Sequence, residues 1–417
     1  MLTFLITIIK LLVILCVVAT IHEFGHFLFA KIFKMGVNEF SIGFGPKIFQ
    51  KEYKGTKYSL RCLPLGGFCA IEGEDGESES ESSFVNKSPL KRIIVLVAGV
   101  MFNAMLAVII FMIIGFSVST YNTKITSLDE SSPLYKSGVQ IGDEIYSVNG
   151  KRVHIVDEVL SKKSDLPENV KIEYLRNGKI ESTVVNGAVT NIGYIGVSFK
   201  LNDEKTQVTN EIDMVASGGA AVETGLKSGD RIIKVGDVST FDSTQIINIV
   251  KQNANKTLIL TIQRDGEIIE KSITPSSQRY FSLGAFSTEE VKPNLSLALV
   301  SAKNNFKNII GSYVDLFKGN VSVNEMSGIV GIGEVVSKTD SFISFLNLLG
   351  IISLAVGVAN IMPFPPLDGG KVVLVLIEAI TKKRVPIKVE AIISYIGLAL
   401  LIVLTIFVTY NDIIRLI

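Results

Sequence analysis

The chain has 417 residues, a formal net charge of +1 and a hydrophobic fraction of 47%. Its length is enough for several domains, and its mean hydropathy of +0.42 is high for a soluble protein, so we expect membrane spans. The balanced charge gives no indication of a nucleic-acid partner, and the three cysteines have neither the number nor the spacing of a disulfide framework.

Four long apolar segments predict a multi-pass α-helical protein of the cell membrane. They cover residues 2–29, 93–117, 342–362 and 391–408, and each has close to the ~20 apolar residues that cross the hydrocarbon core. Basic residues flank the loop between spans one and two and precede span four, so the positive-inside rule places both loops in the cytoplasm. These residues are Lys31, Lys34, Lys91, Arg92, Lys382, Lys383, Arg384 and Lys388. The N-terminus and the long middle region are then expected to be extracytoplasmic.

The first span contains the motif H-E-x-x-H at His22, Glu23 and His26, near its expected cytoplasmic end. On a helix, the two histidines lie four residues apart on one face, so both imidazoles can reach one metal ion. Glu23 lies beside them and is placed to accept a proton from water. Ionisable groups at membrane depth cost roughly a few kcal/mol each and mark functional sites. The third histidine, His154, is predicted to be a surface or groove residue of the middle region.

The loop after the first span is predicted to form a small cytoplasmic β-hairpin that dips toward these residues. The stretches G-F-G-P at 43–46 and P-L-G-G-F at 64–68 flank strand-like runs. An exposed edge there could pair with an unwound substrate segment, and an ordinary loop hairpin is the alternative. Residues 72–83, rich in glutamate and serine, indicate a solvated, flexible connector. Residues 1–118 form the first predicted domain.

The middle region contains an internal repeat. G-V-Q-I-G-D-E-I at 138–145 matches G-L-K-S-G-D-R-I at 225–232, and small residues precede each copy at 131–133 and 217–221. The dipeptides N-G at 177–178 and D-G at 265–266 then mark matching hairpin turns. The repeat resembles two tandem α/β domains of the bacterial PDZ type, at 119–200 and 201–288. Such domains bind extended peptides or trimmed protein ends along a sheet edge.

A third candidate metal ligand follows the third span. An amphipathic helix is expected at 294–317 within a connector at 289–340, and spans three and four form a last domain at 341–417. The sequence N-I-M-P-F-P-P-L-D-G-G at 360–370 places three prolines after the third span, which break the helix. Asp368 is therefore expected in a non-helical elbow at the depth of the histidines. Its carboxylate completes a His₂Asp set with an open fourth position, as in catalytic zinc sites.

These motifs together are similar to the site-2 protease family. The similarity covers H-E-F-G-H, G-F-G-P, P-L-G-G-F, the paired PDZ-like repeats and N-x-x-P-x-P-x-L-D-G-G in this order, and is strongest for the bacterial branch that cleaves anti-sigma factors. The resemblance implies Zn²⁺ ligands at His22, His26 and Asp368, a catalytic glutamate at Glu23, and a role for Asn360 in holding substrate or the oxyanion. One departure is Ile329, where the family often has proline.

We therefore expect an intramembrane zinc metalloprotease that cleaves transmembrane segments of single-span membrane proteins, with its active site near the cytoplasmic face. Anti-sigma factors, remnant signal peptides and pheromone precursors are all compatible substrates. One alternative is a membrane-anchored PDZ adaptor with a non-catalytic metal site, against which the intact Glu23 argues. A zinc transporter is a further alternative, against which the few polar groups in the spans argue.

Overall fold

The computed structural model describes residues 2–74, 76, 80–160, 167–202, 207–216, 219–319 and 328–416. The chain forms two compact units. A helical unit contains residues 2–117 and most of the chain from Ala298 to Ile413, and a sheet unit contains Val118–Leu297. Part of the predicted connector, at 75 and 77–79, and two of the small residues before the second repeat, at 217–218, lie outside the described residues.

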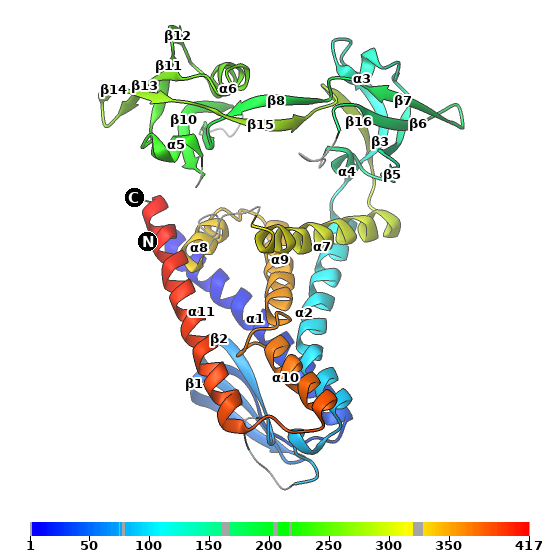
Figure 1. Cartoon of the computed structure of the whole chain (residues 1–417), viewed down its shortest axis with the longest axis vertical. Coiled ribbons are helices and arrows are strands. Elements are labelled where there is room, and N and C mark those ends of the chain that lie inside the picture. The colour runs from blue at the N-terminus through cyan, green and yellow to red at the C-terminus, as the bar shows by residue number, and fades with distance from the viewer. Residues whose placement is uncertain are drawn as a thin grey trace. The chain divides into compact units, whose positions relative to one another are not determined.

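Within the described residues, four helices are long and apolar enough to cross a membrane, which confirms the four predicted spans. They are α1 (Leu2–Ile32), α2 (Pro89–Ser117), α9 (Phe342–Asn360) and α11 (Ile387–Leu416). Helix α2 packs against both α1 and α9 (Figure 1). A Cβ atom on Gly25 of α1 would lie 2.5 Å from the carbonyl oxygen of Ala98 on α2. Glycine therefore permits the close approach of these two helices.

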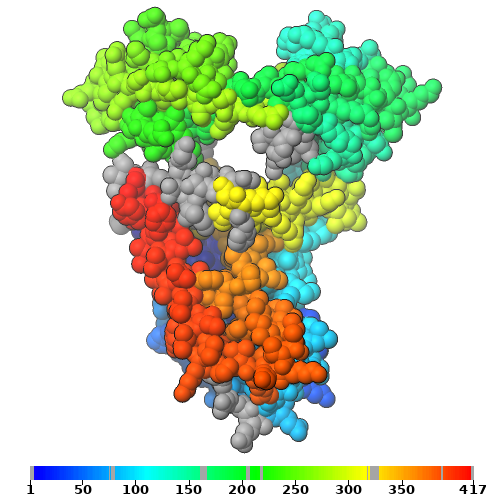
Figure 2. All heavy atoms as spheres, viewed as in Figure 1, coloured from blue at the N-terminus to red at the C-terminus, as the bar shows by residue number. Residues whose placement is uncertain are grey.

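Helix α11 lies at the surface of the helical unit (Figure 2). Many of its large apolar side chains are exposed. Tyr395 is 72% exposed, and Val403 and Ile406 are each 64% exposed. Large apolar side chains in such number are not left facing water, and lipid tails are the solvent that suits them. The exposed face of α11 is therefore consistent with a membrane-integral protein.

Three further helices accompany the spans in the described part of the chain. Helix α7 (Leu295–Phe317) lies where the amphipathic helix was expected, whereas α8 (Ile329–Ser337) and α10 (Asp368–Thr381) were not expected from the sequence. The expectation that Asp368 lies in a non-helical elbow is wrong, because Asp368 is the first residue of α10. The proline-rich turn ends one residue earlier. Gly369 and Gly370 press against the backbone of that turn, where a Cβ atom would collide, so the helix can begin directly after it.

The predicted hairpin is present and is longer than expected. Strand β1 (Val37–Tyr53) pairs with β2 (Thr56–Ile71) around a turn at Lys54 and Gly55, both with positive φ. Shifts of register let residues 39–42 pair with 57–60 on one side and with 67–70 on the other. The end of β2 therefore forms an outer edge of this small sheet, and β2 packs on α1. The 3₁₀ helix η1 (Phe84–Asn86) then leads into α2.

The sheet unit contains two modules with matching strand order. In the first module the order is β16-β3-β4-β6-β7 with β5 beside β4, and in the second it is β9-β10-β11-β13-β14 with β12 beside β11. The first module comprises β3 (Thr120–Leu128), α3 (Pro133–Lys136), β4 (Glu144–Val148), β5 (Lys151–Arg152), α4 (Val156–Leu160), β6 (Val170–Arg176), β7 (Lys179–Val185) and β16 (Phe286–Val291). The second comprises β9 (Val197–Leu201), β10 (Val208–Val215), α5 (Ala220–Glu223), β11 (Arg231–Val235), β12 (Val238–Ser239), α6 (Ser243–Gln252), β13 (Leu258–Arg264) and β14 (Glu267–Ile273).

Strand pairing does not follow the predicted boundaries at 200 and 288. Strand β9, which begins before residue 200, pairs with β10 of the second module, and β16, which spans residue 288, pairs with β3 of the first. The second module is therefore inserted between β7 and β16 of the first. Strands β8 (Val189–Tyr194) and β15 (Ser276–Phe281) lead out and back as an antiparallel pair (Figure 1). A tandem division misses this arrangement because each module takes its edge strand from beyond the predicted limit.

The internal repeat is visible as a repeated ion pair. Arg176 donates from Nε and Nη2 to the two carboxylate oxygens of Asp143 at 2.8 and 2.7 Å, and Arg264 donates likewise to Asp230 at 2.6 and 2.8 Å. Each arginine also donates to the carbonyl of the first glycine of its G-x-x-x-G-D signature. Both aspartates are buried. The signature and the hairpin turn thus form one bidentate contact in each module.

Candidate metal centre

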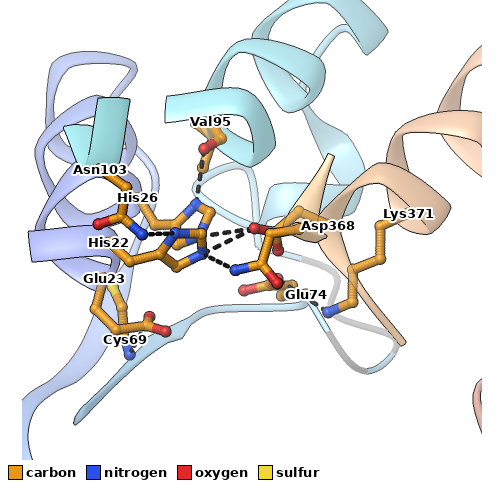
Figure 3. Close-up of polar contacts among 10 residues, drawn as sticks. His22, Glu23, His26, Cys69, Glu74, Val95, Asn103, Asp368 and Lys371 are labelled. Atoms are coloured by element: carbon orange, nitrogen blue, oxygen red, sulfur yellow. Dashed lines mark hydrogen bonds and ion pairs between the residues drawn. The ribbon is translucent and has the colours of Figure 1, made fainter. Parts of the chain in front are cut away.

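The three predicted metal ligands come together from α1 and the start of α10 (Figure 3). Asp368 Oδ2 lies 2.9 Å from His22 Nε2 and 3.4 Å from His26 Nε2, and the two Nε2 atoms are 3.1 Å apart. One ligand atom from each residue lies within 4.8 Å of the others, and all three side chains are largely buried. Two imidazole nitrogens and one carboxylate oxygen are the donor set of a catalytic zinc site, so these residues fit a zinc ion.

One face of α2 supports both histidine rings. Val95, Gly99 and Asn103 follow one another at four-residue spacing on this helix. His26 Nδ1 lies 2.8 Å from the carbonyl oxygen of Val95, and Asn103 Nδ2 lies 3.4 Å from His22 Nδ1 (Figure 3). A Cβ atom on Gly99 would lie 2.5 Å from His26 Nε2 and 2.8 Å from His22 Nε2. Only a residue without a side chain leaves room for both rings.

These α2 residues were not among the site residues expected from the sequence. A signal was available, because an asparagine inside an apolar span is expensive to insert and needs a partner there. Val95 contributes only its backbone carbonyl, so its side-chain identity carries no signal.

Glu23 is oriented by the β1–β2 hairpin. The backbone N–H of Cys69 in β2 donates to Glu23 Oε2 at 3.0 Å (Figure 3). Cys69 is paired in register with Phe40 of β1, so an N–H that bonds Glu23 points away from β1 toward the outer edge. The outer edge of β2 therefore faces the glutamate of the H-E-x-x-H motif.

Asn360 is the last residue of α9, and its Nδ2 lies 3.3 Å from His22 Nε2. The structure thus brings Asn360, the fifth predicted site residue, beside one of the three candidate ligand atoms. His154 does not join them. It lies in the sheet unit, its side chain is 44% exposed, and it contacts Glu158, which agrees with the expected surface position.

A polar cavity of about 550 Å³ borders α10. Lys371, one turn after Asp368, donates to Glu74 Oε1 at 3.0 Å, and this ion pair joins α10 to the segment that follows β2 (Figure 3). Both residues line the cavity, together with Arg92, Glu378 and Glu390. Lys371 therefore brings the charged wall of this cavity to within one helical turn of Asp368 on α10.

The fold and this centre define the chain as a membrane-integral metalloprotease, and the comparisons with known proteins agree. The model of the family described as "Peptidase family M50" matches residues 10–404, so the chain belongs to this family. It is 30% identical to the putative zinc metalloprotease Cj1068 of Campylobacter jejuni, over 95% of this chain and 90% of that protein. It is 28% identical to the zinc metalloprotease RasP of Oceanobacillus iheyensis, over 98% and 99% of the two chains.

These findings confirm the predicted family, the enzyme class of zinc metalloprotease and Zn²⁺ as the cofactor. They favour the protease over the adaptor and transporter alternatives. Among solved structures, the HtrA3 PDZ domain bound to a phage-derived ligand is 21% identical and covers 22% of this chain and 92% of that domain, at a TM-score of 0.19.

Proposed function

We propose that the chain hydrolyses peptide bonds within transmembrane segments of single-span membrane proteins, with zinc held by His22, His26 and Asp368. The observation that carries this proposal is the convergence of three ligand atoms within 4.8 Å in a unit built of four apolar helices. Two of the ligands lie on a candidate membrane span, α1, so the chemistry would take place where transmembrane substrates are found.

The residues around this centre have complementary roles in hydrolysis. Bound zinc supplies Lewis acidity, which acidifies water and polarises a peptide carbonyl. The Glu23 carboxylate accepts the proton of the attacking water and returns it to the leaving amide nitrogen. The N–H of Cys69 holds Glu23 Oε2 in place for both transfers. The Asn360 amide, 3.3 Å from His22 Nε2, is positioned to donate a hydrogen bond to the carbonyl oxygen of the scissile bond.

A transmembrane helix shields its peptide bonds, so the substrate must unwind before cleavage. The outer edge of β2 could hold the unwound stretch as an added strand. The N–H of Cys69 on this edge points toward Glu23, so the edge lies next to the catalytic glutamate. A substrate strand added along this edge would lie beside the general base. Hydrolysis also needs water, for which the polar cavity beside Lys371 and Glu74 is a source.

We further propose that the two sheet modules are PDZ domains outside the cytoplasm, which admit or dock proteins already trimmed on that side. Their matching strand order and repeated Asp–Arg contact support two copies of one fold. The basic flanks of spans one, two and four support a cytoplasmic hairpin and active site. Anti-sigma factors and remnant signal peptides remain the substrate classes that suit this arrangement.

The experiment uses the purified chain in detergent with a labelled single-span substrate, and compares wild type with Glu23→Gln. Wild type should cleave, a zinc chelator should abolish cleavage, and added zinc should restore it. Glu23→Gln should lose about 10²–10⁴-fold in rate, as expected for a general base, while it keeps its zinc content. Equal cleavage by both proteins would refute the role of Glu23.

A second pair of substrates tests unwinding. One carries helix-breaking residues within its span and the other carries leucine at the same positions. The first should be cleaved faster, because it has less helix to lose. Equal rates would argue against cleavage within an unwound transmembrane segment.

A further inference from the structure

Asn103 is a polar side chain enclosed beside the candidate ligands. It is fully buried, and its backbone carbonyl accepts a hydrogen bond from Ser353 Oγ on α9 at 2.9 Å. A Cβ atom on Gly357 of α9 would lie 3.3 Å from the Asn103 Cβ atom, so this glycine admits the side chain. The carboxamide is thus fixed between α1 and α9, facing His22.

The hydrogen bonding of this carboxamide is incomplete as it stands. Nδ2 faces His22 Nδ1 at 3.4 Å, while Oδ1 is buried with no hydrogen-bond partner among the described residues. An unpaired buried acceptor is costly. The two ends of a carboxamide have nearly the same shape, so a half-turn exchanges them without displacing a neighbour. After the half-turn, Oδ1 faces His22 Nδ1.

A zinc ion held by His22 and His26 would decide between these orientations. A neutral imidazole that binds zinc through Nε2 carries its proton on Nδ1 and donates it to an outer partner. For His26 this partner is the Val95 carbonyl, at 2.8 Å from Nδ1. The matching position for His22, two turns along the same face of α2, is occupied by Asn103.

We propose that Asn103 is a positioning residue that accepts the Nδ1–H of His22, and so fixes the ring in the tautomer that binds zinc through Nε2. This inference rests on the proposed function, in which His22 is a zinc ligand. This role requires a hydrogen-bond acceptor in the side chain at position 103. It involves no contact between Asn103 and the substrate.

Zinc affinity provides the first test. The metal-free full-length chain in detergent is titrated with Zn²⁺ against a chromophoric chelator. Asn103→Leu, similar in size but without an acceptor, should weaken zinc binding about 10–100-fold, as loss of an outer-shell partner does. Asn103→Asp restores an acceptor and should bind zinc close to wild type. Ser353→Ala, which loses a hydrogen bond to the backbone of the same residue, is the control for packing and should also stay close to wild type.

The tautomer itself can be observed, because the chain has only three histidines. With ¹⁵N-labelled histidine and the variant His154→Gln as background, only the rings of His22 and His26 give signals. Both should show protonated Nδ1 when zinc is bound. Asn103→Leu should shift the His22 Nδ1 signal and leave that of His26 unchanged.

The outcomes separate this inference from the proposed function. If His22→Ala binds zinc as tightly as wild type, His22 is not a ligand and the proposed metal set fails. If His22→Ala loses zinc but Asn103→Leu keeps the affinity and the His22 signal of wild type, only the role of Asn103 is overturned. An Asn103→Asp protein as weak as Asn103→Leu would also overturn it. Thermal unfolding of each metal-free variant checks that it is folded.

Discussion

Arg92 on α2 and Glu378 on α10 form an ion pair inside the helical unit, with Nη1 2.5 Å from Oε2. Their side chains are only 10% and 12% exposed. Helix α2 carries the partners of both histidine rings, and α10 begins with Asp368. This ion pair therefore joins the helix that supports two candidate ligands to the helix that supplies the third.

Removal of Glu378 should destabilise the helical unit. Glu378→Ala leaves the Arg92 charge buried without its partner, a change that costs about 3–5 kcal/mol in comparable pairs. Zinc affinity should fall as well, because Asp368 loses its anchor to α2. The double variant Arg92→Ala/Glu378→Ala removes both charges and should be less destabilised than the sum of the single variants. Thermal unfolding with and without zinc measures this, and strictly additive losses would contradict the coupling.

Gly99→Ala should abolish tight zinc binding. The added methyl group would lie 2.5 Å from His26 Nε2 and 2.7 Å from His22 Cε1, so at least one ring must move. We expect a loss of zinc affinity of at least 10-fold, comparable with loss of an outer-shell partner. The matched control is Gly311→Ala on α7, where a Cβ atom meets nothing within 4 Å. If Gly99→Ala bound zinc like Gly311→Ala, the tight contact would have no functional role.

Local sequence patterns predicted those parts of the structure that depend on local chemistry. The four spans follow from long apolar runs, and the pairing of His22 with His26 follows from helical spacing. The hairpin follows from strand-like runs around a turn. In each case the decisive interactions lie within one element or between neighbouring ones.

The parts that were missed depend on distant segments. The insertion of the second module is set by β16, whose partner β3 precedes it by more than 150 residues, and no local pattern specifies that pairing. The start of α10 at Asp368 depends on how Gly369 packs against the proline-rich turn. The supports of the histidine rings come from α2, and one of them is a backbone carbonyl that any residue could provide.

The repeated Asp–Arg contact should stabilise both modules. Asp143 and Asp230 are buried and each accepts two hydrogen bonds from one arginine, so Arg176→Lys and Arg264→Lys lose the planar, bidentate geometry. We expect each variant to lose about 1–3 kcal/mol of stability, in its own module. Hydrogen exchange, measured on the full chain, reports the stability of each module separately. Lys124→Ala, at an exposed pair 3.7 Å from Glu289, should change little, and an equal effect would contradict the argument.

The thiols of β2 should report whether substrate pairs along its edge. Burial raises the pKa of the Cys69 thiol, whereas Cys62 in the same strand is exposed. The raised pKa means less reactive thiolate at a given pH, so Cys69 should label more slowly than Cys62 near pH 7.5 and gain rate as the pH rises. Single-cysteine proteins, with the other two cysteines changed to alanine, allow each thiol to be followed alone.

A bound substrate should slow the labelling of Cys69 further and leave Cys62 unaffected. The protein for this measurement is Glu23→Gln, which should bind the single-span substrate without cleaving it. Cys69 lies beside Glu23 through its N–H, so a strand added at the β2 edge covers it. If both thiols slowed equally, the substrate would be covering the hairpin as a whole. If neither changed, pairing along this edge would be excluded, while the metal centre would be unaffected by that result.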